Sequence, residues 1–175
     1  AENGVQVDAV ELDPGVVKAA EKHFNLSENK NLSVHTMDGR EFLEKTNKTY
    51  DLIVLDAYRK DKVPFHLATE EFFELTHKKT DGNGVVVSNI ISSASGPGSE
   101  FAKAYTNTLN QEFESIYFFK TRDSSSVQNL EVIATKNPKV SEEELGRKAE
   151  NFELRNLTEE IENQENLSYR DAQVL

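Results

Sequence analysis

The sequence predicts an α/β fold with a mostly parallel sheet and helices on both faces of that sheet. Short apolar segments alternate along the chain with helical patterns of about ten to fifteen residues, which is the order of βαβ units. The last two apolar segments, residues 115–120 and 129–135, are joined by a polar loop and predict an antiparallel hairpin. A chain of 175 residues is long enough to bury a sizeable core.

The first predicted strand and helix lie within residues 5–24. Residues 5–12 (VQVDAVEL) alternate toward a short buried strand that stops at Asp13-Pro14. A capping carboxylate followed by proline in the first turn begins a helix that extends to about residue 24. One face of this helix carries Val16, Val17, Ala20 and Phe24.

The next elements end in the most apolar strand of the chain. Residues 32–37 predict a second strand, after which Asp38 caps a short helix that contains Phe42 and Leu43. Residues 50–55 (YDLIVL) form a near-continuous apolar run, which is typical of a strand buried on both faces of a parallel sheet.

The second half of the chain continues the alternation. Residues 69–79 predict a helix, the Gly-Asn-Gly sequence at residues 82–84 breaks it, and residues 85–91 predict the next strand. A glycine- and serine-rich, linker-like loop (residues 92–99) leads into a helix at residues 99–113. In the helix predicted at residues 69–79, the side chains expected to point inward are Phe72, Phe73 and Leu75.

The C-terminal part differs in composition. Ser141 and the three glutamates after it resemble a capping box that opens a charged helix, and the pattern fades beyond residue 151. We therefore divide the chain into a domain at residues 1–138 and an acidic helix and tail at residues 139–175.

Composition excludes several classes of function. With 31 acidic and 20 basic residues the net charge is −11, which repels phosphate backbones and argues against nucleic acid as a partner. No cysteine is present, which excludes disulfides and thiolate metal sites. The apolar runs are too short to span a bilayer, so we expect no direct membrane contact from this chain and a cytoplasmic location. The four histidines lack metal-ligand spacing, and no G-x-S-x-G elbow of a hydrolase occurs.

Carboxylates follow three of the predicted strands. In an open α/β sheet, ligands bind at the carboxyl ends of the strands. Glu11 at the end of the first strand can accept both hydroxyls of a ribose, or it is a solvated charge that caps a loop. Asp38, followed by Gly39, can accept a hydrogen bond from the amine of adenine, and it can cap its helix at the same time.

The third carboxylate, Asp56, follows the most apolar strand. We expect it to be partly desolvated, which raises a carboxyl pKa and suits a general base or a group that holds an ammonium. The alternative is an ordinary loop cap. Tyr58, beside it, can stack on a ring of a ligand or pack as a surface aromatic.

Five segments occur in an order and spacing that resembles the spermidine synthase family, whose members have a class I, Rossmann-like methyltransferase fold. The segments are VELDP, MDGREFL, YDLIVLDAY, VPFHLATEEFFEL and GNGVVVSNI, and the resemblance runs from about residue 7 to residue 135. Each segment alone is a weak signal, and their order makes the resemblance specific.

The resemblance implies roles for the strand-end residues. Glu11 would hold the ribose of S-adenosylmethionine or of its decarboxylated form, Asp38 with Gly39 would contact the adenine, and Asp56 would deprotonate and orient the attacking amine. The remaining residues that it implies are Asp13 and Ala57 toward the cofactor, and Tyr58, Arg59 and Glu100 toward the substrate.

Two features depart from the family pattern. The family usually carries a second aspartate three residues after the first, in a D-x-x-D-P sequence, and here Arg59 stands at that place, which argues against putrescine as the acceptor. The family's first strand and its glycine-rich loop would precede residue 5, and its usual acidic ending would follow residue 175. We therefore expect a piece of a longer protein, truncated at both ends. The missing first strand would leave a gap in the sheet, so we expect that another segment fills this gap or that the strands pair differently. Some relatives carry membrane spans upstream.

The leading hypothesis is a spermidine synthase-like transferase domain that moves an aminopropyl group from decarboxylated S-adenosylmethionine to an amine. The alternatives are a methyltransferase with an unknown acceptor, an NAD-dependent oxidoreductase on the same fold, and a non-catalytic scaffold or binding domain. Residues 1–138 would bind the S-adenosyl compound as cosubstrate, without a metal. The expected partner is a small-molecule amine or another nucleophilic acceptor, and a homodimer remains open.

Overall fold

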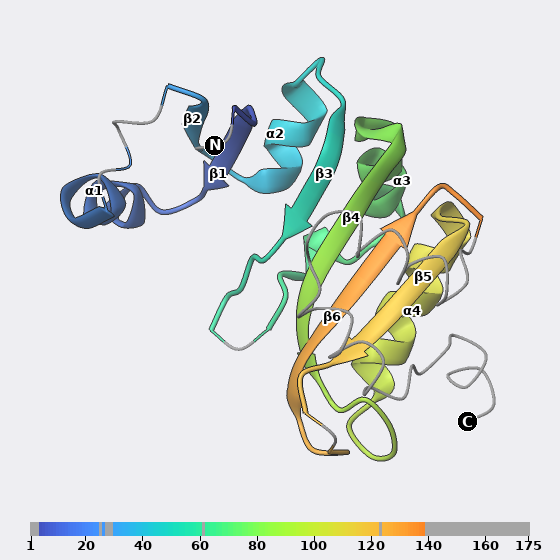
Figure 1. The fold of residues 1–175 in the computed structure, drawn as a ribbon. Helices are drawn as coiled ribbons and strands as arrows, with labels where there is room; N and C mark the ends of the chain where they lie inside the picture. Colours follow the sequence, from blue (N-terminus) through green and yellow to red (C-terminus); the bar gives the residue numbers. More distant parts are fainter. Residues whose placement is uncertain (1–3, 25, 27–29, 61, 123, 139–175) are drawn as a thin grey trace. The chain divides into compact units, whose positions relative to one another are not determined.

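The elements of the chain alternate as the sequence predicts (Figure 1). The structure is a computed structural model that describes residues 4–24, 26, 30–60, 62–122 and 124–138. The charged helix predicted from Ser141 onward, and the tail after it, lie outside the described residues. The chain divides into two compact units, Ala1–Lys48 and Thr49–Leu175, and each is described by itself.

Unit 1 contains a pair of parallel strands and two helices. Strand β1 (Val7–Glu11) pairs with β2 (Leu32–Thr36), and Glu11 lies opposite Thr36 at their carboxyl ends. Helix α2 (Gly39–Lys45) begins at Asp38 as predicted, and it buries Phe42 and Leu43. These two side chains are the buried apolar residues among those described in this unit.

A small charged network ties the two strands of unit 1 together. Asp8 on β1 contacts the His35 ring at 2.9 Å and the Lys48 ammonium at 2.7 Å. The Asp8 side chain is only 7% exposed, so its charge depends on these partners. The His35 ring in turn packs on Phe42, with 4.6 Å between the ring centroids.

Helix α1 (Pro14–Phe24) has the predicted bounds but none of its described residues is buried. Val16 and Phe24, which belong to the predicted apolar face, are exposed. The spacing of apolar residues therefore predicted the helix, but it did not predict the exposure of Val16 and Phe24 on its apolar face.

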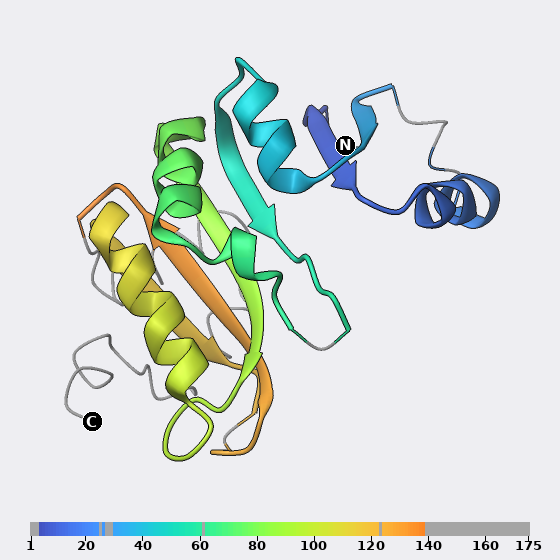
Figure 2. The same ribbon diagram turned by 180° about the vertical axis from the view of Figure 1, so that it is seen from behind.

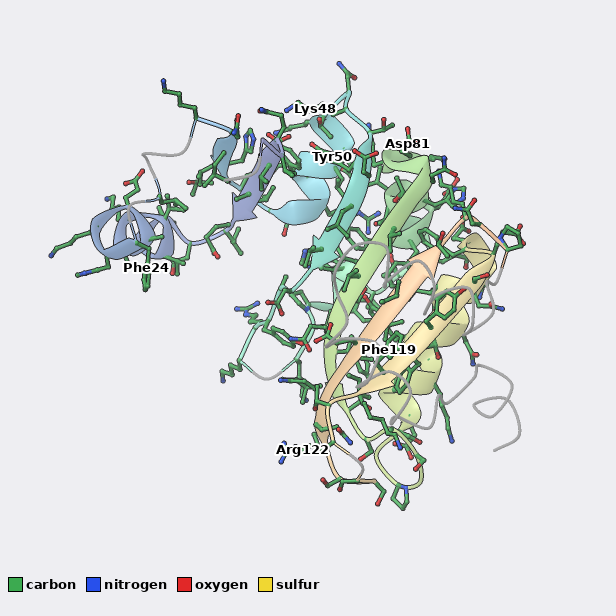
Figure 3. All side chains as sticks on the ribbon, in the orientation of Figure 1. Phe24, Lys48, Tyr50, Asp81, Phe119 and Arg122 are labelled. Atoms are coloured by element: carbon green, nitrogen blue, oxygen red, sulfur yellow. The ribbon has the colours of Figure 1, made fainter. Side chains whose placement is uncertain are left out.

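Unit 2 is built on a four-stranded sheet with the order β3-β4-β6-β5. Strand β3 (Tyr50–Leu55) runs parallel to β4 (Thr80–Ser92). Strand β6 (Gln128–Thr135) runs antiparallel to both β4 and β5 (Ser115–Lys120), which confirms the predicted hairpin. Figure 3 shows Tyr50 and Asp81 at the end where β3 and β4 begin, and Arg122 toward the opposite end.

Two helices cover one face of this sheet, as Figure 2 shows. Helix α3 (Glu70–Lys79) follows a short 3₁₀ turn (Phe65–Leu67), and α4 (Glu100–Glu112) follows β4. The Thr69 hydroxyl caps α3 by accepting the amide of Phe72 at 3.3 Å. The core between helices and sheet includes Phe72, Phe73, Tyr105, Leu109, Val86, Ile90, Leu130 and Val132, all of them nearly or fully inaccessible.

The opposite face of the sheet carries no helix among the described residues (Figure 1). The expectation that residues 50–55 are buried on both faces is therefore wrong. Ile53 points into the core, but Leu52 and Val54 are 54% and 59% exposed. Strand β3 is also an edge strand of the described sheet. The described part of unit 2 therefore leaves some apolar side chains of this strand uncovered.

The Gly-Asn-Gly sequence does not separate α3 from β4. Strand β4 begins directly at Thr80, and the register against β3 shifts between Tyr50 and Leu52, opposite the glycines. A Cβ atom on Gly84 would lie 2.8 Å from the Tyr50 carbonyl oxygen and 2.7 Å from Thr80 Cγ2. Gly84 therefore permits a close approach of two backbones, which is a common use of glycine in a strand.

Replacing Gly84 with alanine should destabilise the fold by about 1–3 kcal/mol, because the Tyr50 carbonyl must move to admit the methyl group. Thermal unfolding of the 175-residue chain measures the effect. Gly82→Ala is the matched control, since a Cβ atom there meets nothing within 4 Å. Equal melting temperatures for the two variants would contradict this account of the close approach at Gly84.

None of the described helices is long and apolar enough to cross a bilayer.

Candidate functional site

The predicted residues of unit 1 gather at the carboxyl ends of β1 and β2. Glu11 Oε1 accepts the amide of Asp13 at 2.8 Å, and Asp13 Oδ1 accepts the amide of Gly15 at 2.7 Å. Asp13 thus opens α1 as predicted. One carboxylate oxygen of Glu11 caps the loop, and the second oxygen can accept a hydrogen bond from a ligand.

Asp38 lies at the end of the neighbouring strand. Its Oδ1 accepts the amides of Arg40 at 2.9 Å and Glu41 at 3.3 Å, which confirms the predicted cap of α2. The amide of Met37 donates to the Glu11 carbonyl at 3.1 Å, so the ladder between the strands continues up to Asp38. Gly39 follows with open space around its α-carbon, which leaves room for a flat ligand group.

Asp56 follows β3 in unit 2, and its environment differs from the prediction. It is exposed, as is Ala57, so the expected desolvation of Asp56 is wrong. Among the described residues, β3 is an edge strand of its sheet, with β4 as its neighbour. One of its oxygens, Oδ1, accepts the side-chain amide of Asn89 at 3.1 Å.

Tyr58 is half-buried and anchored to the same residue of β4. Its hydroxyl donates to the Asn89 carbonyl oxygen at 2.6 Å. Burial, followed by the negative charges of Asp56 and Glu131, raises the pKa of Tyr58 to about 12. The phenol is therefore a permanent hydrogen-bond donor at neutral pH, fixed beside Asp56 through Asn89.

Arg59 lies in a tight turn that follows Tyr58. Its amide donates to the Lys62 carbonyl at 2.9 Å, and Lys60 between them adopts a left-handed conformation with φ of 63°. The Arg59 side chain is exposed. The turn thus presents a cation to solvent at the position where the related family carries a carboxylate.

The glycine- and serine-rich loop after β4 is a closed structure rather than a linker. Ser92 Oγ and the Ser93 amide both donate to the Gly98 carbonyl, at 3.1 Å and 3.3 Å, and the Ser99 hydroxyl donates to the Gly96 carbonyl at 2.7 Å. Gly96 and Gly98 have positive φ values, 68° and 89°, which favour glycine. Glu100 begins α4 immediately afterward and is exposed.

Two residues that the sequence analysis did not single out join Asp56 on the open face of the sheet. Asn89 of β4 bonds to Asp56, and Glu131 of β6 lies directly opposite Asn89 in the antiparallel register. The buried Oδ1 of Asn89 has no hydrogen-bond partner among the described residues. Burial, and then the charge of Asp56, raise the pKa of the Glu131 carboxyl.

Glu131→Gln should therefore raise the melting temperature at pH 7. A carboxyl whose pKa is higher in the folded state binds its proton more tightly there, so its ionised form costs stability above its ordinary pKa of 4.5. Because solvent screens this half-exposed group, we expect a gain of only about 1–2 °C. The gain should shrink as the pH falls toward 4.5 and vanish below it.

Glu114→Gln is the control for that measurement, since Glu114 is exposed in the turn before β5. Melting curves of both variants from pH 7 to pH 4 test the prediction. A destabilised Glu131→Gln at pH 7 would contradict it.

The described residues contain no group of three or more metal-ligating side chains. His35 is engaged with Asp8, and His77 packs edge-on against Phe113 with 5.3 Å between the ring centroids. The chemistry that these residues offer is thus that of carboxylates, an amide and a phenol.

Comparisons with known proteins show the family and the fold of the chain. A family model described as the spermine/spermidine synthase domain matches residues 3–137. A polyamine aminopropyltransferase of Vibrio vulnificus is 34% identical over 122 residues, which cover 68% of this chain and 39% of the relative. A probable polyamine aminopropyl transferase of Bifidobacterium longum is 30% identical over 166 residues, which cover 94% of this chain and 36% of the relative. The chain thus spans less than half the length of these two relatives.

The fold has solved counterparts as well. The structure of human methyltransferase-like protein 13 in complex with SAH superposes with a TM-score of 0.71 at 20% identity, covering 86% of this chain and 70% of that one. This likeness confirms the Rossmann-like methyltransferase fold. From the matched residues and the identity to its relatives, the chain belongs to the spermine/spermidine synthase domain family.

Proposed function

We propose that this chain is part of an aminopropyltransferase, in which Asp56 receives and orients the amine that attacks the aminopropyl carbon of decarboxylated S-adenosylmethionine. The observation that carries the proposal is the position of Asp56 at the carboxyl end of β3, held by the Asn89 amide at 3.1 Å. Its place in a chain of this family, after the segment YDLIVL, supports the role.

The reaction needs little from the protein beyond orientation and a base. A sulfonium is a reactive leaving group, so an amine lone pair forms the new C–N bond while the C–S bond breaks and neutral methylthioadenosine leaves. The product ammonium loses its surplus proton, which Asp56 can accept and pass to solvent because it is exposed. The Asn89 bond to Oδ1 keeps the carboxylate in one orientation during the attack.

Unit 1 supplies residues whose chemistry fits an adenosyl group. Glu11 uses Oε1 for the Asp13 amide and can offer Oε2 to ribose hydroxyls. Asp38 ends the adjacent strand, and Gly39 after it leaves space for a flat base. Acceptors for hydroxyls and for an exocyclic amine, at the ends of parallel strands, are the set expected of an adenosine site. In this proposal Asp13 and Ala57 also line the nucleotide, and Tyr58, Arg59 and Glu100 line the acceptor.

Methyl transfer is the second candidate. Arg59 replaces an acidic residue of the family pattern, and human methyltransferase-like protein 13, whose structure holds SAH, shares the fold. In that case S-adenosylmethionine would be the methyl donor. The acceptor would then be a nucleophile that need not carry a second amino group.

Product analysis separates the two reactions. The natural protein that contains this chain is incubated with either donor and a set of amines, and the nucleoside product is identified by mass spectrometry. Aminopropyl transfer releases methylthioadenosine from the decarboxylated donor, whereas methyl transfer releases S-adenosylhomocysteine from S-adenosylmethionine. Formation of S-adenosylhomocysteine alone would overturn the proposal in favour of the second candidate.

A further inference from the structure

A charged contact joins the two strands of unit 1 shortly before the ends that carry Glu11 and Asp38. Asp8 lies on β1 ahead of Glu11, and His35 lies on β2 ahead of Asp38. Asp8 Oδ1 is 2.9 Å from His35 Nε2. The contact therefore links the strands close to the residues that the proposed function assigns to the adenosyl group.

The two side chains share one face of the strand pair. Asp8 lies level with Ser33, and His35 comes two positions after Ser33 on β2, so both point to the same side. The Asp8 side chain is only 7% exposed there. Its second oxygen, Oδ2, lies 2.7 Å from the ammonium of Lys48, which follows α2 (Figure 3). Each oxygen of this buried carboxylate thus has a nitrogen partner.

The same contact reaches the helix that Asp38 begins. The His35 ring packs on Phe42 of α2, with 4.6 Å between the ring centroids. Phe42 is buried, and Asp38 caps the first turn of that helix. His35 therefore touches β1 through Asp8 and α2 through Phe42, so it connects the elements that support Glu11 and Asp38.

Unit 1 has few apolar contacts that could fix these elements instead. Among its described residues, the buried apolar side chains are Phe42 and Leu43. Regions with few buried apolar contacts open at a low cost in free energy. A buried carboxylate that loses a partner is strongly destabilising. We therefore expect the spacing of the two strand ends to depend on the contact between Asp8 and His35.

Histidine is the side-chain type in this network whose charge ordinarily changes between about pH 5 and pH 8. A neutral ring can donate one hydrogen bond to a carboxylate. A protonated ring donates a charge-assisted one, which is about twice as strong. Protonation of the His35 ring therefore strengthens its bond to Asp8 and with it the link between β1 and β2.

The other groups around the ring leave Asp8 as its main charged partner. From α2 the ring meets Phe42, which does not titrate. Lys48 opposes protonation of the ring by its positive charge, but its side chain is 64% exposed, so solvent screens it. The charged residues of α2 form ion pairs along the helix, Arg40 with Glu44 and Lys45 with Glu41.

We propose that Asp8 and His35 are positioning residues for the adenosyl site, and that proton uptake by His35 tightens the binding of adenosyl compounds. The inference rests on the proposed adenosyl roles of Glu11 and Asp38. A protonated His35 holds β1, β2 and α2 in the arrangement in which both of those carboxylates meet the ligand. Ligand binding and protonation then favour each other, and linkage makes this coupling reciprocal.

The test follows the affinity for methylthioadenosine as the pH changes, in the natural protein that contains this chain. This ligand carries no charge at neutral pH, and carboxylates ordinarily stay ionised above about pH 5.5. We expect the affinity to be about fivefold or more higher at about pH 5.5 than at about pH 8, which is the lower end of the usual coupling between two sites.

His35→Gln separates protonation from hydrogen bonding. The glutamine amide can still donate to Asp8, but it takes up no proton. We expect this variant to bind like the wild-type protein at about pH 8 and to show no gain at about pH 5.5. His23→Gln is the matched control and should keep the gain, since His23 is an exposed histidine of α1 in the same unit.

A second measurement needs no variant. Calorimetric titration of the wild-type protein in buffers of different ionisation enthalpy gives the number of protons taken up on binding. Near neutral pH we expect a net uptake, because the ligand favours the protonated ring. His35→Gln should lose this uptake and His23→Gln should keep it, and melting curves show that both variants are folded.

The outcomes separate this inference from the proposed function. A gain in affinity that His35→Gln retains overturns the positioning role, and so does a wild-type protein without the gain and without proton uptake. Methylthioadenosine formed by the wild-type protein in either case leaves aminopropyl transfer standing. Binding that depends on His35, without any aminopropyl transfer, supports the network and overturns the proposed reaction alone. A wild-type protein that binds no methylthioadenosine at either pH overturns the adenosyl site and this role together.

Discussion

Asp56→Asn should lower turnover by about a hundredfold or more in the natural protein that contains this chain, with a much smaller effect on cofactor affinity. The substitution keeps the volume of the side chain and removes its charge. The amine then loses its proton acceptor and its orienting anion together, and general-base catalysis commonly contributes about that much. Single-turnover rates at saturating donor and amine measure the effect on the chemical step.

The competing account of Asp56 is a loop cap, and it predicts a different result. A cap would lower the melting temperature of the variant and leave the rate of its folded fraction normal. Asp51→Asn is the matched control, because Asp51 is an exposed aspartate of the same strand. An unchanged single-turnover rate for Asp56→Asn would show that the family's catalytic role does not extend to this chain.

The strand-end residues could be predicted because their placement is a local property. Glu11, Asp38 and Asp56 each follow an apolar run directly, so finding the strand also finds the residue. The two helix caps at Asp13 and Asp38 follow for the same reason, since a capping bond joins residues two or three positions apart.

Asn89 and Glu131 could not be found in this way. Their position beside Asp56 depends on which strands are neighbours and on the register between these strands, and both are set by the packing of the whole sheet. A shift of one residue in β6 would turn Glu131 into the core and Leu130 outward. The sequence offered one signal, a single charged residue within the apolar run of residues 130–134, which marks the open face of a half-buried strand.

Burial was the least predictable property. Periodicity correctly gave the helix at α1 and the strand at β3, but Phe24, Leu52 and Val54 are exposed in the structure. A periodic pattern shows which residues share a face of a helix or strand. Whether that face is buried depends on other elements, which are distant in the sequence. The exposure of Asp56 is a further example, since in the described part of the chain β3 is an edge strand and Asp56 directly after it is exposed.

Glu11→Gln should weaken the binding of adenosyl compounds by about tenfold or more and leave turnover at saturation nearly unchanged. Glutamine keeps an Oε1 that can accept the Asp13 amide, so the turn into α1 is preserved. Its second terminal atom becomes an amide nitrogen, which cannot accept a ribose hydroxyl. One hydrogen bond to a charged group is lost, and such bonds contribute about 1.5–3 kcal/mol. Calorimetric titration with methylthioadenosine measures the affinity.

Glu21→Gln is the control for this variant, since Glu21 is exposed on α1 and the same charge is removed from the same unit. Equal weakening in both variants would mean that net charge, rather than a ribose contact, governs the affinity. A fall in saturated turnover as large as that of Asp56→Asn would place Glu11 at the reacting centre instead. The two variants are expected to have opposite effects, on affinity for Glu11 and on rate for Asp56. The hydrogen bond from the ribose to Glu11 persists throughout the reaction, so its loss weakens binding. The interaction of Asp56 with the attacking nitrogen forms only during the attack, so its loss slows the chemical step.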